Sequence, residues 1–94
     1  SSDEMAEWAD ALNGDAAAFA SIFDRHKARV FRHAVYQLGH REDAEDATAA
    51  AFLELWRRRK HVTVLDGSVL PWLLVTTTNL SRNVGRRVGD METC

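Results

Sequence analysis

Along the chain, stretches in which hydrophobic residues recur three and four positions apart alternate with short polar breaks. In the first stretch, residues 3–12, Met5, Trp8 and Leu12 fall on one side, and an Asn-Gly pair closes it. Apolar residues at this spacing form one face of an α-helix, and Asn-Gly favours a turn. Residues 3–12 are therefore predicted to be a short amphipathic helix.

The second stretch, residues 16–38, has the same periodicity and an informative residue at each end. Asp15 precedes it and is a favourable N-cap, while Gly39 follows it and suits the left-handed conformation that ends many helices. The apolar positions expected to face the core are Phe19, Ile22, Phe23, Val30, Ala34 and Leu38. This spacing predicts one long helix.

A third helix is predicted to begin in HREDAEDA, where carboxylates suit the first turns, and to end at a basic run, RRRK. Its core stripe is predicted to contain Phe52, Leu55 and Trp56. Residues 61–70 break the period with β-branched residues and an Asp-Gly turn signal, and Pro71 suits the first turn of a last helix. The expected fold is all-α: a compact four-helix bundle with an irregular loop before the last helix.

The last helix has two different faces when its residues are placed at intervals of about 100°. Leu73, Thr77, Leu80 and Val84 form one stripe, which can supply the core contact. A second stripe combines an indole with hydroxyl, amide and guanidinium groups: Trp72, Thr76, Asn79, Asn83 and Arg86. An indole can stack on an unpaired base, and the polar groups can bind base edges and phosphate. A tryptophan packed on a neighbouring helix, beside solvated polar residues, explains this pattern about equally well.

Composition and charge narrow the class of protein. Of 94 residues, 46% are hydrophobic and 28% are charged, which suits one globular domain without a membrane span. The single cysteine, Cys94, allows no internal disulfide and favours a reducing cytoplasm. The net charge of −2 argues against a protein that coats nucleic acid without sequence preference. Acidic and basic blocks alternate, which indicates two chemically different partners or simply complements the helix dipoles.

Patterns for catalysis and metal binding are weak. His26 and His33 would share a face of the long helix, but no cysteine or carboxylate pair completes a metal site at ligand spacing. There is also no serine, histidine and aspartate arrangement and no glycine-rich phosphate loop. We therefore expect no enzyme activity, no metal and no cofactor, with the histidines satisfied or solvated.

Three blocks stand in order along the chain: GDAAAFASIFDRHKARVFRHAVYQLG, DAEDATAAAFLELWRRR and PWLLVTTTNLSRNVGRR. Together they resemble domain 2 of bacterial sigma factors of the extracytoplasmic-function (ECF) type, in the sigma-70 family. The resemblance runs from about residue 4 to residue 87 and implies that residues 1–94 are one region 2 domain. Each block alone is a weak signal, whereas three in order at suitable separations are specific.

In this family the helix that opens with DAED docks on the clamp helices of the β′ subunit of RNA polymerase. The resemblance assigns this contact to Asp43, Asp46, Ala49, Ala50 and Leu53. The alanine pair replaces a Gln-Glu pair that is common in the family, which implies fewer polar contacts with polymerase. Phe52 and Trp56 are expected on the core side.

Similar proteins use the loop and the last helix to capture the non-template strand of the promoter −10 element, with one base turned into a pocket of the loop. The matching loop is residues 61–69. The positions assigned to DNA are Asp66, Gly67, Ser68, Trp72, Thr76, Asn79, Asn83 and Arg86. Val75 and Thr78 stand where the family commonly has basic residues, which implies weaker attraction to phosphate.

The resemblance further implies a natural chain that continues into a second, helix-turn-helix domain for the −35 element, absent from these 94 residues. Similar proteins are often held inactive by an anti-sigma factor, which no residue here indicates. A different class stays open: a helical protein–protein interaction module without DNA binding, in which the stripe containing Trp72 would be replaceable. A helix-turn-helix that recognises duplex is disfavoured, because the irregular loop is longer than its usual tight turn.

Overall fold

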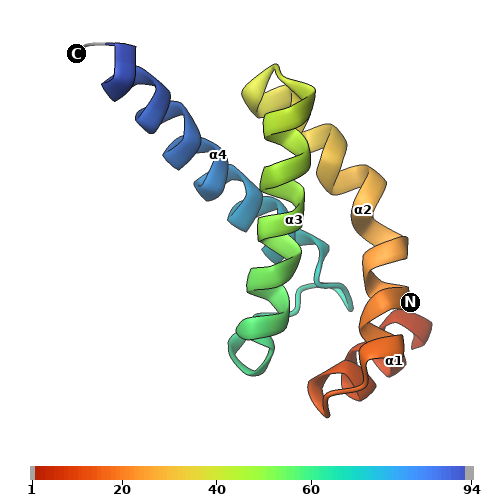
Figure 1. Ribbon diagram of the computed structural model, residues 1–94. Helices are drawn as coiled ribbons and strands as arrows, with labels where there is room; N and C mark the ends of the chain where they lie inside the picture. Colours follow the sequence, from red (N-terminus) through yellow and green to blue (C-terminus); the bar gives the residue numbers. More distant parts are fainter. Residues whose placement is uncertain (1, 93–94) are drawn as a thin grey trace.

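The structure, a computed structural model, describes residues 2–92, with side chains described for residues 3–83. Four α-helices make up this part of the chain (Figure 1): α1 (Ser2–Leu12), α2 (Ala16–Leu38), α3 (Arg41–Arg57) and α4 (Leu70–Glu92). A short 3-10 helix, η1 (Arg59–His61), follows α3 and begins the connection to α4. The predicted all-α fold, with an irregular loop before the last helix, is confirmed. No helix in the described range is long and apolar enough to cross a membrane.

The ends of α2 are set by the two residues predicted from the sequence. Asp15 Oδ1 accepts hydrogen bonds from the amides of Ala17 at 2.9 Å and Ala18 at 3.1 Å, which satisfies two donors of the first turn. At the other end, Gly39 has a φ of 74° and donates its N–H to the Val35 carbonyl at 2.7 Å. Both caps are local interactions, and both predictions are confirmed.

The central element of the bundle is α2, because α1, α3 and α4 all pack against it. Figure 1 shows α1 folded back beside the start of α2, and α4 diverging from the other helices towards its C-terminal end. Every helix contributes at least one large side chain to the main core, in which Trp8, Ile22, Leu55 and Leu73 are at most 2% exposed. A smaller cluster of alanines joins the end of α2 to the start of α3.

All of the core positions predicted for α2 and α3 are buried or half-buried. The buried ones are Ile22, Val30, Ala34, Phe52 and Leu55. Trp56 is only half-buried, because it lies at the edge of the contact between α2 and α3. It meets the ring of Phe19 edge-on at a centroid distance of 5.0 Å, so it forms a wall at the surface and not part of the interior.

The buried stripe of α1 differs from the predicted one. The sequence pattern places Met5, Trp8 and Leu12 on the core side, whereas the buried residues are Glu4, Trp8 and Ala11. Met5 and Leu12 are half-buried at the edges of this stripe. The helix is turned in this way because the Glu4 carboxylate finds donors on other elements, so a charged residue occupies a core-facing position.

Candidate nucleic-acid interface

One face of α4 is buried, as its sequence predicts, and a second face beside it is at least partly accessible. Leu73 and Thr77 are completely buried and Leu80 is half-buried, while the side chain of Val84 lies outside the described range. The Thr77 hydroxyl donates to the Leu73 carbonyl at 2.7 Å, so this buried polar group is satisfied. Ser81 continues the buried face by a further turn.

The accessible face of α4 forms one wall of a groove, and α3 forms the facing wall. This groove, called the α3–α4 groove below, has a volume of about 530 Å³. Its α4 wall consists of Trp72, Thr76, Asn79, Leu80 and Asn83. Its α3 wall consists of Ala50, Leu53, Glu54, Arg57 and Arg58. Four residues of the predicted stripe therefore line one hollow, and the fifth, Arg86, lies outside the residues whose side chains are described.

Trp72 belongs to both the core and the groove. Its indole packs against the main core cluster and remains partly accessible where it lines the α3–α4 groove. The packed alternative left open by the sequence is therefore realised in part, while stacking of a base on the accessible part of the indole stays a prediction. Thr76 is half-buried, and Asn79 and Asn83 are exposed. An indole that the core already holds on one side has little side-chain freedom left to lose when a ligand stacks on the other.

The α3 wall of the groove is only weakly basic. Glu54 accepts a hydrogen bond from Arg57 at 3.0 Å, and its other carboxylate oxygen lies 2.9 Å from Nε of Arg58. Two guanidinium groups therefore share one carboxylate, which leaves a net charge of about +1 among the three side chains at neutral pH. Such a wall attracts a polyanion mildly, so shape and stacking must contribute much of any binding.

The five α3 positions that the family resemblance assigns to polymerase form one accessible strip, called the α3 strip. Asp46, Ala49 and Leu53 are exposed, Leu53 by 57%, and Asp43 and Ala50 are half-buried. At about 100° per residue, they occupy about a third of the helix circumference, away from its buried face. Ala50 and Leu53 also line the α3–α4 groove, so the two predicted surfaces meet along this edge.

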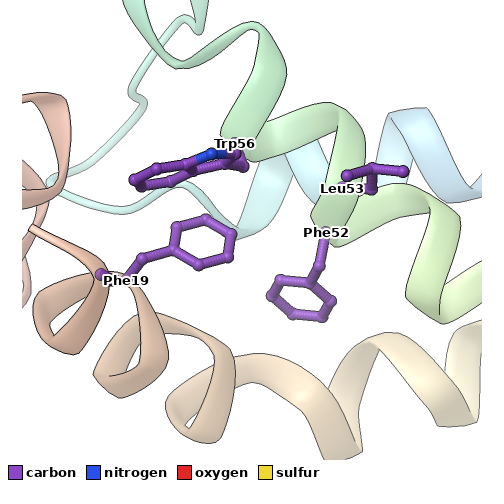
Figure 2. Close-up of a pocket in the computed structure, with 5 residues that line it drawn as sticks. Phe19, Phe52, Leu53 and Trp56 are labelled. Atoms are coloured by element: carbon purple, nitrogen blue, oxygen red, sulfur yellow. The ribbon is translucent and has the colours of Figure 1, made fainter. Parts of the chain in front are cut away.

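A second, apolar hollow lies between α2 and α3 (Figure 2). It has a volume of about 270 Å³ and is lined by Ala16, Phe19, Phe52, Leu53 and Trp56. The guanidinium of Arg59 lies over the Trp56 ring, 4.1 Å from its centroid. Leu53 lines both this hollow and the α3–α4 groove, so its exposed side chain can make an apolar contact with a partner.

The loop before α4 contains a tight hairpin turn. Asp66 and Gly67 have φ values of 53° and 72°, and Leu65 and Ser68 exchange backbone hydrogen bonds of 3.1 and 3.0 Å across them. Positive φ at both central residues is typical of a type I′ turn, which Asp-Gly favours. Asp66 is exposed, whereas Gly67 and Ser68 are half-buried. None of these three residues, which the family resemblance assigns to DNA, is among the described residues that line the α3–α4 groove.

A buried carboxylate behind this loop was missed by sequence reasoning. Glu4 is 4% exposed and accepts a hydrogen bond from the Val69 amide at 2.9 Å. His26 Nε2 lies 3.1 Å from the same carboxylate oxygen, without the alignment of a hydrogen bond. Burial raises the pKa of Glu4, but the Val69 amide and then the His26 and Ser68 side chains outweigh it, so the net pKa lies below its ordinary value. The available signal was the position of Glu4 one helical turn before Trp8.

His33 contacts a different element from His26. Its Nε2 atom lies 2.8 Å from the Thr78 hydroxyl, and this contact ties α2 to α4. Both histidines thus have a polar neighbour from another part of the chain. Within the residues whose side chains are described, no group of three or more His, Cys, Asp and Glu could hold a metal ion.

Comparison with known proteins gives a consistent family. A profile described as Sigma-70 region 2 matches residues 22–89. The ECF RNA polymerase sigma factor BldN of Streptomyces coelicolor is 34% identical over 77 residues, which cover 82% of this chain and 28% of that protein. The ECF RNA polymerase sigma factor SigK of Mycobacterium bovis and Mycobacterium tuberculosis is 37% identical over 60 residues, which cover 64% of this chain and 32% of SigK.

The chain spans less than a third of the length of these curated relatives. No solved structure was found to match it. The family profile nevertheless covers most of the chain, including all of α3, the loop and α4 as far as residue 89. The chain therefore belongs to the sigma-70 region 2 family, of the type found in ECF sigma factors.

Proposed function

We propose that this chain is the promoter-recognition and polymerase-docking domain of an ECF sigma factor. It acts in transcription initiation, in the cytoplasm, and catalyses no reaction itself. Its partners are the β′ clamp helices of RNA polymerase and the non-template strand of the −10 element. The observation on which the proposal rests is the α3–α4 groove, in which a core-anchored indole, Trp72, stands beside the polar side chains of Thr76, Asn79 and Asn83.

The groove suits a single strand better than a duplex. A base that has left the duplex can stack on Trp72, and the amides of Asn79 and Asn83 can bind its edge. Stacking on an aromatic side chain contributes about 1–3 kcal/mol per base, whereas opening a duplex requires about 1.4 kcal/mol per base-pair step. Stacking of one flipped base can therefore offset the opening of about one base-pair step, but not the opening of a whole bubble. The domain captures a strand that polymerase helps to open.

The α3 strip supplies the polymerase contact. Asp43 and Asp46 provide charge at one end of the strip, and the exposed Leu53 provides apolar surface at the other. Because Ala49 and Ala50 have no polar side-chain groups, binding depends on the two aspartates and on Leu53.

Fluorescence anisotropy tests the DNA-binding part of the proposal. The probe is a labelled single-stranded oligonucleotide selected by the wild-type chain from a randomised pool, with a β′ clamp-helix fragment present. Trp72→Ala and Asn79→Ala are expected to weaken binding, Trp72→Ala by about tenfold or more. Tyr36→Ala is the matched control, because it also truncates an aromatic side chain, and Tyr36 is 87% exposed on α2 and does not line the groove.

Two outcomes would overturn this part. One is wild-type binding by both Trp72→Ala and Asn79→Ala while circular dichroism shows an intact fold. The other is tight, sequence-selective binding of duplex by the domain alone, since that would contradict a requirement for polymerase.

A pull-down with the β′ clamp helices tests the docking surface. Asp46→Ala is expected to reduce capture, because it removes an exposed charge from the α3 strip. Glu45→Ala is the control, since Glu45 lies outside the strip and pairs with Arg41 at 3.3 Å. Full capture by Asp46→Ala would remove this carboxylate from the docking surface.

A protein–protein interaction module without DNA binding is the second candidate. The apolar hollow beside the exposed Leu53 favours it, because such a hollow suits a partner's apolar side chain. In that case the wild-type chain selects no oligonucleotide, and Trp72→Ala changes no DNA binding.

A further inference from the structure

The start of α4 is held by side chains that do not belong to it. The Val69 amide donates to Glu4 of α1 at 2.9 Å, and the Leu70 amide donates to the Ser68 hydroxyl at 3.0 Å. Amides at the start of a helix have no partner within the helix, so these two bonds satisfy groups that would otherwise need water. Glu4, which accepts the first of these two bonds, lies 65 positions before Val69 in the chain.

The same end of α1 also supports the hairpin turn. A Cβ placed on Gly67 would lie 3.9 Å from Cγ of Met5, so the Met5 side chain of α1 lies close to the turn. The Glu4 carboxylate, 4% exposed, faces His26 from α2 as well as the loop. If the loop moved away, a buried charge would lose the Val69 amide as a donor, which is unfavourable in a site that water barely reaches.

We propose that Glu4 is a positioning residue for promoter-strand recognition: it fixes the turn and the start of α4 relative to Trp72. This inference rests on the proposed function and names a residue that touches no DNA. A loop held in place before binding loses less freedom when the strand arrives. If the loop has its binding-competent conformation in only a fraction of the molecules, the apparent affinity for the strand is multiplied by that fraction.

The test measures strand binding by Glu4→Ala, Glu4→Gln and the control Glu7→Ala, with the selected oligonucleotide and the β′ clamp fragment. Glu4→Ala is expected to bind about tenfold more weakly, as when one molecule in about ten has a competent loop, and to discriminate less against a scrambled oligonucleotide. Glu4→Gln retains most of the affinity, because a carboxamide oxygen still accepts from Val69. Glu7→Ala binds like wild type, since Glu7 pairs with Arg25 on the surface at 2.9 Å.

Two further readouts separate positioning from general damage to the fold. Capture by the β′ clamp helices is expected to be unchanged in every variant, because the α3 strip does not contact Glu4. Amide hydrogen exchange at Val69 and Leu70 is expected to accelerate in Glu4→Ala, while amides in the middle of α2 stay protected. If Glu4→Ala does not fold, Glu4→Asp replaces it, because it keeps the charge but withdraws it from the Val69 amide.

The outcomes distinguish this inference from the proposed function. If the wild-type chain binds the clamp but no strand, the proposed function fails. If the wild-type chain binds the strand and folded Glu4→Ala or Glu4→Asp binds it equally well, the positioning role of Glu4 is overturned. Failure of Glu4→Gln to restore binding would equally contradict a role through the Val69 amide.

Discussion

Residues only two positions apart in α4 have opposite surroundings. Leu73 is completely buried in the main core, whereas Val75 is 62% exposed. This contrast is what the helical period predicts for a helix with one buried face. It also means that the two positions can be compared directly, because substitutions there affect packing very differently within the same helical segment.

Leu73→Ala is expected to lower the free energy of unfolding by about 2–5 kcal/mol, since truncation leaves a cavity in the core. Val75→Ala is expected to change it by no more than about 0.5 kcal/mol. Urea unfolding followed by circular dichroism measures both. Similar effects at the two positions would show that α4 packs with a different face.

Glu4 leads to a prediction about acid stability. Its pKa in the folded protein lies below the ordinary value of 4.5, so the charged carboxylate stabilises the fold at pH values above 4.5. This stabilisation is lost as the pH falls through the lowered value. Urea midpoints of wild type and Glu4→Gln should therefore differ at neutral pH and converge on acidification below 4.5. A difference that does not change with pH would contradict this.

Single residues also show where sequence reasoning stops. Asp15, Gly39 and the Asp66-Gly67 turn were predictable, because each effect depends on the backbone within a few residues. The amide that donates to Glu4 lies 65 positions away, so the residues next to Glu4 in the sequence do not indicate this bond. A charged side chain at a core-facing position is instead expected to be solvated unless a partner is known.

At the scale of elements, α2 organises the molecule because the other three helices pack against it. Its beginning is fixed by one side chain, Asp15, whose carboxylate accepts from two amides. The α3–α4 groove is also a property of elements. The wheel of α4 predicted Trp72 and Asn79 on one face, but the facing wall depends on how α3 packs, which a pattern within one helix cannot give.

Asp15→Ala is expected to reduce the free energy of unfolding by about 0.5–2 kcal/mol through loss of the N-cap. Asp10→Ala is the control, because Asp10 is an exposed aspartate near the end of α1 whose side chain caps no helix. Thermal unfolding of both variants measures the difference. Equal melting temperatures would show that the cap contributes little to the folded state.

At the scale of the whole molecule, much of the basic charge is already paired. Arg25 lies 2.9 Å from Glu7, Lys27 lies 3.1 Å from Asp24, and Glu54 is shared by two arginines beside the groove. The chain as a whole has a net charge of −2. For the proposed strand binding, we therefore expect long-range attraction to be modest and contacts within the groove to matter more.

Strand binding is accordingly expected to depend weakly on salt. For single strands, the logarithm of the binding constant falls by about 0.7 per phosphate contact for each tenfold rise in salt, and we expect a slope that corresponds to about one to three contacts. Glu54→Gln should steepen it, because Arg57 and Arg58 lose their shared carboxylate. Anisotropy titrations over a salt series measure this, and a wild-type slope equivalent to about six contacts would contradict it.

The part of the chain that matches the family profile is shorter than the part that forms the folded core. The family profile begins at Ile22, after the whole of α1. Yet Trp8 and Ala11 of that helix are in the core, and Glu4 holds the Val69 amide. A recombinant protein trimmed to the family boundary would thus expose apolar surface on α2 and remove the acceptor that holds the Val69 amide beside the turn. Expression boundaries for similar domains are better chosen from buried contacts than from the extent of a profile.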